Sequence, residues 1–114
     1  MRPEQRVELI VKAVMLLRAE GHEANPADEV GKRYSEMPGF FRGWADVIAI
    51  YSDGKITAIK LSKAEPAKIF ARRIATTPAR KDKAMQIARL WLKGKNAMEH
   101  WLFTESGDFV RTPI

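Results

Sequence analysis

The sequence predicts a single α/β domain in which a mixed central sheet, built around a β-hairpin, is flanked by helices. Three observations predict it: an amphipathic N-terminal segment, two apolar strands joined by a short turn, and two helical segments that precede a further apolar strand. The chain has 114 residues, of which 46% are hydrophobic and 30% charged. This composition is typical of one compact globular domain, which we place at residues 1–114.

The first helix is predicted over residues 3–19. Pro3 suits a first helical position, and Gly21 suits a helix end. Apolar residues follow helical spacing at Val7, Ile10, Val11, Val14 and Leu17. A second set widens this face at Leu9, Ala13 and Leu16. We therefore expect this helix to be packed on two sides.

The segment between this helix and the hairpin carries weaker signals. Asn25-Pro26 favours a bend, and a short strand is predicted near residues 29–34. Residues 35–43 are predicted to form a loop, because two glycines and a proline punctuate them.

The hairpin is the strongest strand signal in the sequence. Residues 44–51 are apolar on both faces except at Asp46, which predicts a central, covered strand. A turn at 52–54 leads into a second strand over 56–62. A two-residue loop would place Asp46 opposite Leu61, whereas a three-residue loop would place it opposite Lys60. We favour the three-residue loop, because a buried carboxylate is costly without a partner.

Two helices and a strand complete the predicted order. The first helix spans about 66–75, and Thr77 is predicted to cap a second helix that starts at Pro78 and ends at Gly94. A further strand is predicted over 97–104. A turn at 106–108 then precedes a last short strand at 109–110.

Positive charge is concentrated in one part of the chain. The net charge is +6, and residues 65–95 hold nine Lys or Arg against two Asp or Glu. A clustered basic segment is typical of proteins that bind a polyanion. Side chains expected to contact nucleic-acid phosphates are Lys68, Arg72, Arg73, Arg80, Lys81 and Lys83, with Arg42 assisting from the loop.

Several classes of protein and site are excluded or disfavoured. The sequence has no cysteine, which excludes disulfides, thiol catalysis and cysteine-ligated metals, and we expect a reducing cytoplasmic location. No apolar run is long enough to span a membrane, and the basic segment lacks the apolar stripe of an interfacial helix. His22 and His100 lie far apart in the sequence and are interpreted as exposed or capping residues.

A family resemblance is carried by the hairpin. Gly43-Trp44-Ala45-Asp46-Val47-Ile48-Ala49-Ile50, a turn, and Ile56-Thr57-Ala58-Ile59-Lys60-Leu61-Ser62-Lys63 resemble the central hairpin of the PD-(D/E)XK nuclease superfamily. The spacing is most similar to archaeal Holliday junction resolvase-like nucleases. The resemblance implies a restriction-endonuclease-like fold, DNA as partner, branched DNA in particular, and a homodimer.

The same resemblance implies roles for individual residues. Asp46 matches the metal-binding Asp, Glu4 or Glu8 the acid on the first helix, and Gln86 the polar residue on a later helix. The family's Glu-x-Lys positions are held here by Lys60 and Ser62. Because Mg²⁺ needs carboxylate ligands, an ammonium at Lys60 would pair with Asp46 and occupy the metal site itself.

Three functions remain open. The first is a nucleic-acid-binding protein with a nuclease-like fold that has lost cleavage. The second is an active Mg²⁺-dependent DNA endonuclease in which Glu65 replaces the missing acid, with the metal held by Glu8, Asp46 and Glu65 and with Lys60 or Lys63 as the catalytic amine. The third is an inactive protein-interaction subunit of a nuclease complex. A purely structural Asp46–Lys60 pair in an ordinary α/β domain is the plain alternative.

Overall fold

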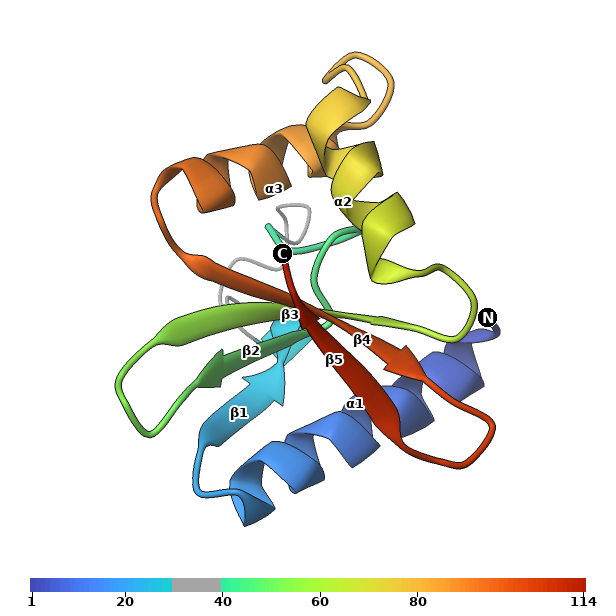
Figure 1. Cartoon of the computed structure of the whole chain (residues 1–114), viewed down its shortest axis with the longest axis vertical. Coiled ribbons are helices and arrows are strands. Elements are labelled where there is room, and N and C mark those ends of the chain that lie inside the picture. The colour runs from blue at the N-terminus through green and yellow to red at the C-terminus, as the bar shows by residue number, and fades with distance from the viewer. Residues whose placement is uncertain (30–39) are drawn as a thin grey trace.

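The chain folds into a five-stranded mixed sheet with helices on both faces (Figure 1). The computed structural model describes residues 1–29 and 40–114. In chain order the elements are α1 (Pro3–Ala19), β1 (Glu23–Pro26), the short 3₁₀ helix η1 (Ala27–Glu29), β2 (Val47–Ile50), β3 (Ile56–Ser62), α2 (Ala67–Thr76), α3 (Lys83–Lys93), β4 (Ala97–Phe103) and β5 (Phe109–Pro113). The strands lie side by side in sequence order; β3 and β4 are parallel, and the other neighbours are antiparallel.

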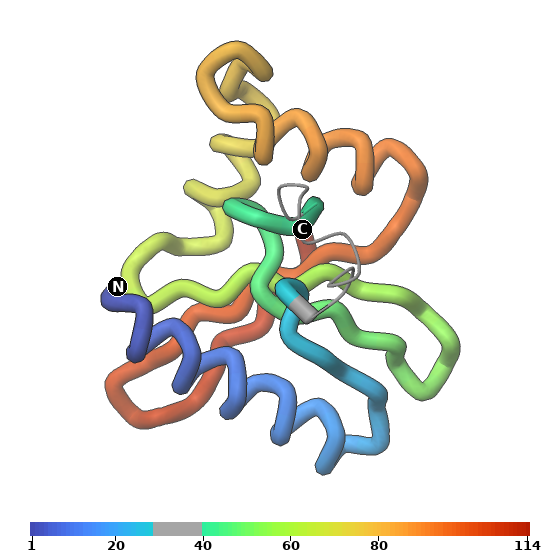
Figure 2. Tube along the Cα trace, turned by 180° about the vertical axis from the view of Figure 1, so that it is seen from behind, coloured from blue at the N-terminus to red at the C-terminus, as the bar shows by residue number. Residues whose placement is uncertain are grey.

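Two apolar cores form, one on each face of the sheet. Helix α1 covers one face, and α2 and α3 cover the other, as both the front and the rear views show (Figures 1 and 2). The largest side chain in the core under α1 is that of Trp101, and the core under α2 and α3 contains Trp44 and Phe70. All three are fully buried. The sheet is therefore a shared wall, which agrees with the apolar character of both faces of its central strands.

The register of the β2–β3 hairpin confirms the predicted three-residue loop. Val47 pairs with Ile59 and Ile50 with Ile56, and Asp46, one residue before β2, has its Oδ2 3.8 Å from Nζ of Lys60. The Tyr51 N–H donates to the Lys55 carbonyl across 2.9 Å and closes the loop. Gly54 has a φ of +87°, a conformation that side chains rarely adopt.

The strand expected at residues 29–34 lies almost wholly outside the described residues. Its one described member, Glu29, belongs to η1. A strand forms earlier, at β1, in the segment where Asn25-Pro26 favoured a bend. Pro26 is compatible with this strand because β1 is at the edge of the sheet, where a missing N–H costs no pairing. The Arg18 guanidinium donates to the Ala24 carbonyl and ties β1 to α1.

Helix α3 begins later than predicted. Thr77 ends α2 rather than starting α3, and the Pro78 carbonyl accepts from the N–H groups of Lys81 and Asp82 in a separate turn. The helix starts at Lys83, where the Asp82 side chain accepts from the Ala84 N–H at 3.0 Å. A Thr-Pro pair resembles a helix start, but the Asp five residues later supplies the cap.

Helix α1 spans the predicted residues and buries part of the predicted apolar face, but it is packed on one side rather than on two. The side chains against the sheet are those of Leu9, Ala13, Val14 and Leu17. Val7 and Val11, which belonged to the predicted stripe, are 59% and 49% exposed, and Met15 is 64% exposed. Within the described structure the helix therefore covers the sheet with one side and leaves a second apolar side uncovered.

Replacing Asp82 with Ala should destabilise the domain by about 1 kcal/mol, because α3 loses its only side-chain cap. Asp82→Asn keeps a carbonyl acceptor and should retain most of that stability. The free energy of unfolding, measured in urea, compares the two variants with the wild type. If α3 began at Pro78, residue 82 would be inside the helix and Asp82→Ala would cost nothing.

Candidate functional site

The backbone around Asp46 is fixed from both sides. Its N–H donates to the Ile59 carbonyl at 2.7 Å, and its own carbonyl accepts from the Ala27 N–H at 2.9 Å. The residue is only 3% exposed. A carboxylate is thus held at the start of β2, between η1 and β3, at a site where water cannot compensate its charge.

The Asp46 carboxylate is compensated by two cations and a backbone amide. Its Oδ1 accepts from Nη2 of Arg6, which comes from the first turns of α1. Its Oδ2 accepts from the Leu61 N–H at 2.8 Å and lies 3.8 Å from Nζ of Lys60. The sequence-derived pairing of Asp46 with Lys60 is therefore present, and Arg6 is a second cation that sequence analysis missed.

This arrangement does not fit a Mg²⁺ site. Mg²⁺ is bound through hard oxygen ligands, and each Asp46 oxygen already faces a cation. Two opposite unit charges about 4 Å apart attract by roughly 4 kcal/mol at an effective dielectric of 20, so a dication must displace strong partners. Among the residues that the structure describes, no group of three His, Cys, Asp or Glu side chains is placed to hold a metal ion.

The residues that follow Lys60 serve the turn into α2. Ser62 is buried, and its Oγ accepts from the N–H groups of Ala64 and Glu65 at 3.2 and 2.8 Å. The Ser62 side chain is thus a turn-forming hydroxyl, at the position where the resemblance implies a catalytic Lys. Lys63 is exposed, with its Nζ 5.9 Å from the centre of the Phe103 ring.

Glu65 is paired with a cation of its own. Its Oε1 accepts from Nη2 of Arg73, a residue in the second turn of α2, at 3.0 Å. The relocated-acid alternative needs Glu65 and Asp46 to share a metal ion, yet each carboxylate has a separate basic partner. Arg73, which was predicted to contact phosphates, is the basic partner in this ion pair.

The remaining predicted acids and the glutamine lie elsewhere. Glu4 and Glu8 are exposed on α1, and Glu8 lines a groove with Val7 and Lys12. Within the described part of the chain, no hydrogen bond joins either acid, or Gln86 on α3, to Asp46. The amide oxygen of Gln86 is buried without a hydrogen-bond partner there. Arg6 holds the place beside Asp46 that the resemblance assigns to a first-helix acid.

A sequence signal for Arg6 did exist. Positions 6, 9, 13 and 17 share one face of a helix, and three of them are buried apolar residues. Arg6 therefore lies at the end of the buried stripe, where a long side chain reaches toward the sheet. The predicted stripe begins at Val7 and leaves out position 6, although its members Val14 and Leu17 are buried together with Leu9 and Ala13.

His100 is buried beside Lys60, which corrects its interpretation as exposed or capping. It pairs with Lys60 across the parallel β3–β4 ladder, and its ring centre lies 5.6 Å from that of Phe70. Neither ring nitrogen has a hydrogen-bond partner among the described residues. Burial lowers the pKa of His100 below its usual range, and the nearby Glu65 opposes this only in part.

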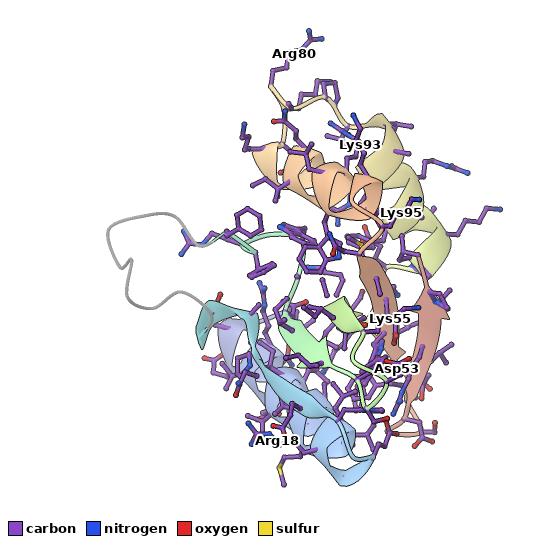
Figure 3. All side chains as sticks on the ribbon, turned by 90° about the vertical axis from the view of Figure 1, so that its left-hand side faces the viewer. Arg18, Asp53, Lys55, Arg80, Lys93 and Lys95 are labelled. Atoms are coloured by element: carbon purple, nitrogen blue, oxygen red, sulfur yellow. The ribbon has the colours of Figure 1, made fainter. Side chains whose placement is uncertain are left out.

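Seven of the nine basic side chains in residues 65–95 are exposed: Lys68, Arg72, Arg80, Lys81, Lys83, Lys93 and Lys95. The other two have structural partners, Arg73 through Glu65 and Arg89 through the carbonyls of Ile74 and Thr77. Figure 3 shows Arg80, Lys93 and Lys95 over the α2–α3 layer, far from Arg18 on α1. Arg42 is exposed and lines a small pocket with Arg6 and Asp28.

Comparison of the chain with protein-family models, curated proteins and solved structures finds no match. In the part of the chain that the structure describes, no helix is both long and apolar enough to cross a membrane. The function therefore has to be argued from the site and the surface themselves.

Replacing Arg6 with Met should destabilise the domain by about 2 kcal/mol, because the buried Asp46 carboxylate loses a charged hydrogen-bond partner. Arg72→Met removes the same charge from an exposed position on α2 and should cost less than about 0.5 kcal/mol. Urea unfolding measures both. Equal costs for the two variants would show that the Arg6 ion pair contributes nothing.

Stability should fall as the pH falls from 7 toward 5. The pKa of His100 is lower in the folded state than the ordinary value near 6.5 expected of the unfolded chain, so the unfolded state binds the extra proton first. The loss is at most about 1.4 kcal/mol per pH unit for one group. His100→Phe should flatten this dependence in urea unfolding at several pH values. An unchanged pH dependence in the variant would assign it to other groups.

Proposed function

We propose that this domain is a restriction-endonuclease-like protein that binds nucleic acid without cleaving it. The order of its elements supports the fold: a helix, three antiparallel strands, helices and a strand parallel to the third. The position of Asp46 directly before the second of these strands, with Nζ of Lys60 from the third strand 3.8 Å from its carboxylate, supports it further.

The observation that carries the loss of cleavage is the state of the Asp46 carboxylate. In metal-dependent nucleases a carboxylate-bound metal activates water and polarises the phosphate. Here an ammonium and a guanidinium take the place of the dication. These groups supply positive charge for a phosphate, but neither lowers the pKa of a bound water as a divalent metal does.

The observation that carries binding is the distribution of exposed charge. Seven exposed cations belong to α2, α3 and the segments beside them, where the acids are Glu65, which is already paired, and Asp82, which caps α3. Contacts from such side chains go to phosphates and fix position without reading sequence. We take DNA as the ligand, with a four-way junction as the first structure to test.

The deciding experiment incubates the full chain with an end-labelled four-way DNA junction, with and without Mg²⁺ or Mn²⁺. The same samples are run on native and denaturing gels. A shifted band with intact strands is the expected result. Metal-dependent nicks would overturn the proposal in favour of a relocated acid, and Glu65→Ala would then be the variant to test. A sample with no band shift and no nicks would overturn the proposal and favour a protein-interaction role.

Binding should weaken steeply with salt. If about six phosphates are neutralised, log affinity should fall against log salt with a slope of roughly −5. Arg80→Gln with Lys81→Gln should reduce that slope by about 2, because two phosphate contacts are lost. The matched control, Arg18→Gln with Lys55→Gln, removes the same charge away from the α2–α3 layer and should leave the slope unchanged (Figure 3). Equal effects of both pairs would mean that net charge alone governs binding.

A further inference from the structure

Phe40 is an exposed aromatic side chain on a backbone that hydrogen bonds hold in place. It is 59% exposed, whereas its neighbour Phe41 is half-buried and packs against the core under α2 and α3. The Phe40 carbonyl accepts from the indole N–H of Trp44 at 3.0 Å. The Phe41 carbonyl accepts from the N–H of Ala45, also at 3.0 Å. This turn therefore holds the Phe40 ring in solvent at a defined place on the surface.

The rings next to Phe40 do not stack flat on it. The Phe41 ring lies 5.0 Å away, centre to centre, at an angle of 90°, and the Trp44 ring lies 6.4 Å away at 75°. Phe41 is in turn 5.9 Å from Trp91 of α3. Edge-to-face contacts of this kind are favourable and orient a ring. Because Phe40 is 59% exposed, part of its ring stays open to a further aromatic group.

Cations adjoin this aromatic turn. Arg42 follows Phe40 by two residues, is exposed, and lines a small pocket at the N-terminal end of α1. Gly43 lies so close to α3 that a Cβ there would be 3.1 Å from the Cβ of Ala84, and the exposed Lys83 directly precedes Ala84. Figures 2 and 3 show the segment that begins at residue 40 running beside α3. An exposed ring with cations beside it is typical of sites that bind single-stranded nucleic acid.

We propose that the Phe40 ring stacks on an unpaired base of the bound DNA, while phosphates of the same strand contact Arg42 and Lys83. Asp28 lines the same pocket as Arg42, so charge alone gives little affinity at this point and the ring has to supply it. A base inside an intact duplex is stacked on both faces and is not accessible to the ring. This contact rests on the proposed function and adds a ligand class to it, DNA with unpaired bases.

The test compares the affinity of the full chain for two ligands, an intact DNA duplex and the same duplex with a single-stranded gap of about six nucleotides. Fluorescence anisotropy at one salt concentration measures both. Phe40→Ala should weaken binding to the gapped duplex about 5- to 150-fold and leave binding to the intact duplex unchanged. Phe40→Tyr keeps a ring and should retain the affinity, whereas Phe40→Leu keeps an apolar side chain without a ring and should lose it.

Leu90→Ala is the matched control, because Leu90 is 60% exposed on α3 and its loss removes a similar apolar surface without a ring. This variant should bind both ligands as the wild type does. Circular dichroism confirms that each variant is folded. A second arm places a photoreactive 5-iododeoxyuridine in the gap. Irradiation should crosslink that base to Phe40, as mass spectrometry of the digested complex would show.

The outcomes separate this contact from the proposed function. If the wild type binds gapped DNA but Phe40→Ala binds it equally well, or weakens on both ligands alike, the stacking contact is wrong and nucleic-acid binding stands. A crosslink confined to other residues, or full affinity in Phe40→Leu, would also overturn the stacking contact. A wild-type chain that binds neither ligand would overturn the proposed function and the stacking contact with it.

Discussion

The Asp46 carboxylate lies where α1, β2 and β3 meet, and its three partners come from α1 and β3. Arg6 reaches it from the helix, Lys60 from the facing strand, and the Leu61 amide from the same strand one residue on. Because Asp46 is only 3% exposed, the loss of any one of these partners should destabilise the folded state. The contacts that compensate its charge therefore favour one hairpin register and one placement of Arg6 and α1 on the sheet. The same two cations lie where a metal ion would have to bind.

The same need made the hairpin predictable from sequence. A polar residue in a strand that is apolar on both faces admits few registers, and only one of the two loops considered gave Asp46 a cation. The start of α3 and the identity of β1 were harder, because a Thr-Pro pair and an Asn-Pro pair have the same local chemistry at a helix cap, a bend or a strand edge. The roles of Arg6 and His100 were not predicted, because their partners come from elements far away in the sequence. Periodicity within one element gives no information about such partners.

The two faces of the sheet have different chemistry. On the α2–α3 side, exposed Lys and Arg side chains outnumber the acids, and the acids there are used for capping and pairing. On the α1 side, acids and bases alternate beside an apolar stripe. Nucleic-acid binding is thus proposed for a surface that the sheet separates from the apolar stripe on α1.

The parallel pairing of β3 with β4 has a consequence for the order in which the chain acquires its structure during synthesis. Thirty-four residues, 63–96, separate the two strands, and α2 and α3 lie within them. The neighbouring antiparallel strands β2 and β3 need only a short loop, so they pair as soon as both have emerged. Until residue 103 leaves the ribosome, the backbone amides and carbonyls along one edge of β3 have no strand to pair with. That interval is the period in which a nascent chain is most prone to pair with another strand, and the length of the α2–α3 crossover sets its duration.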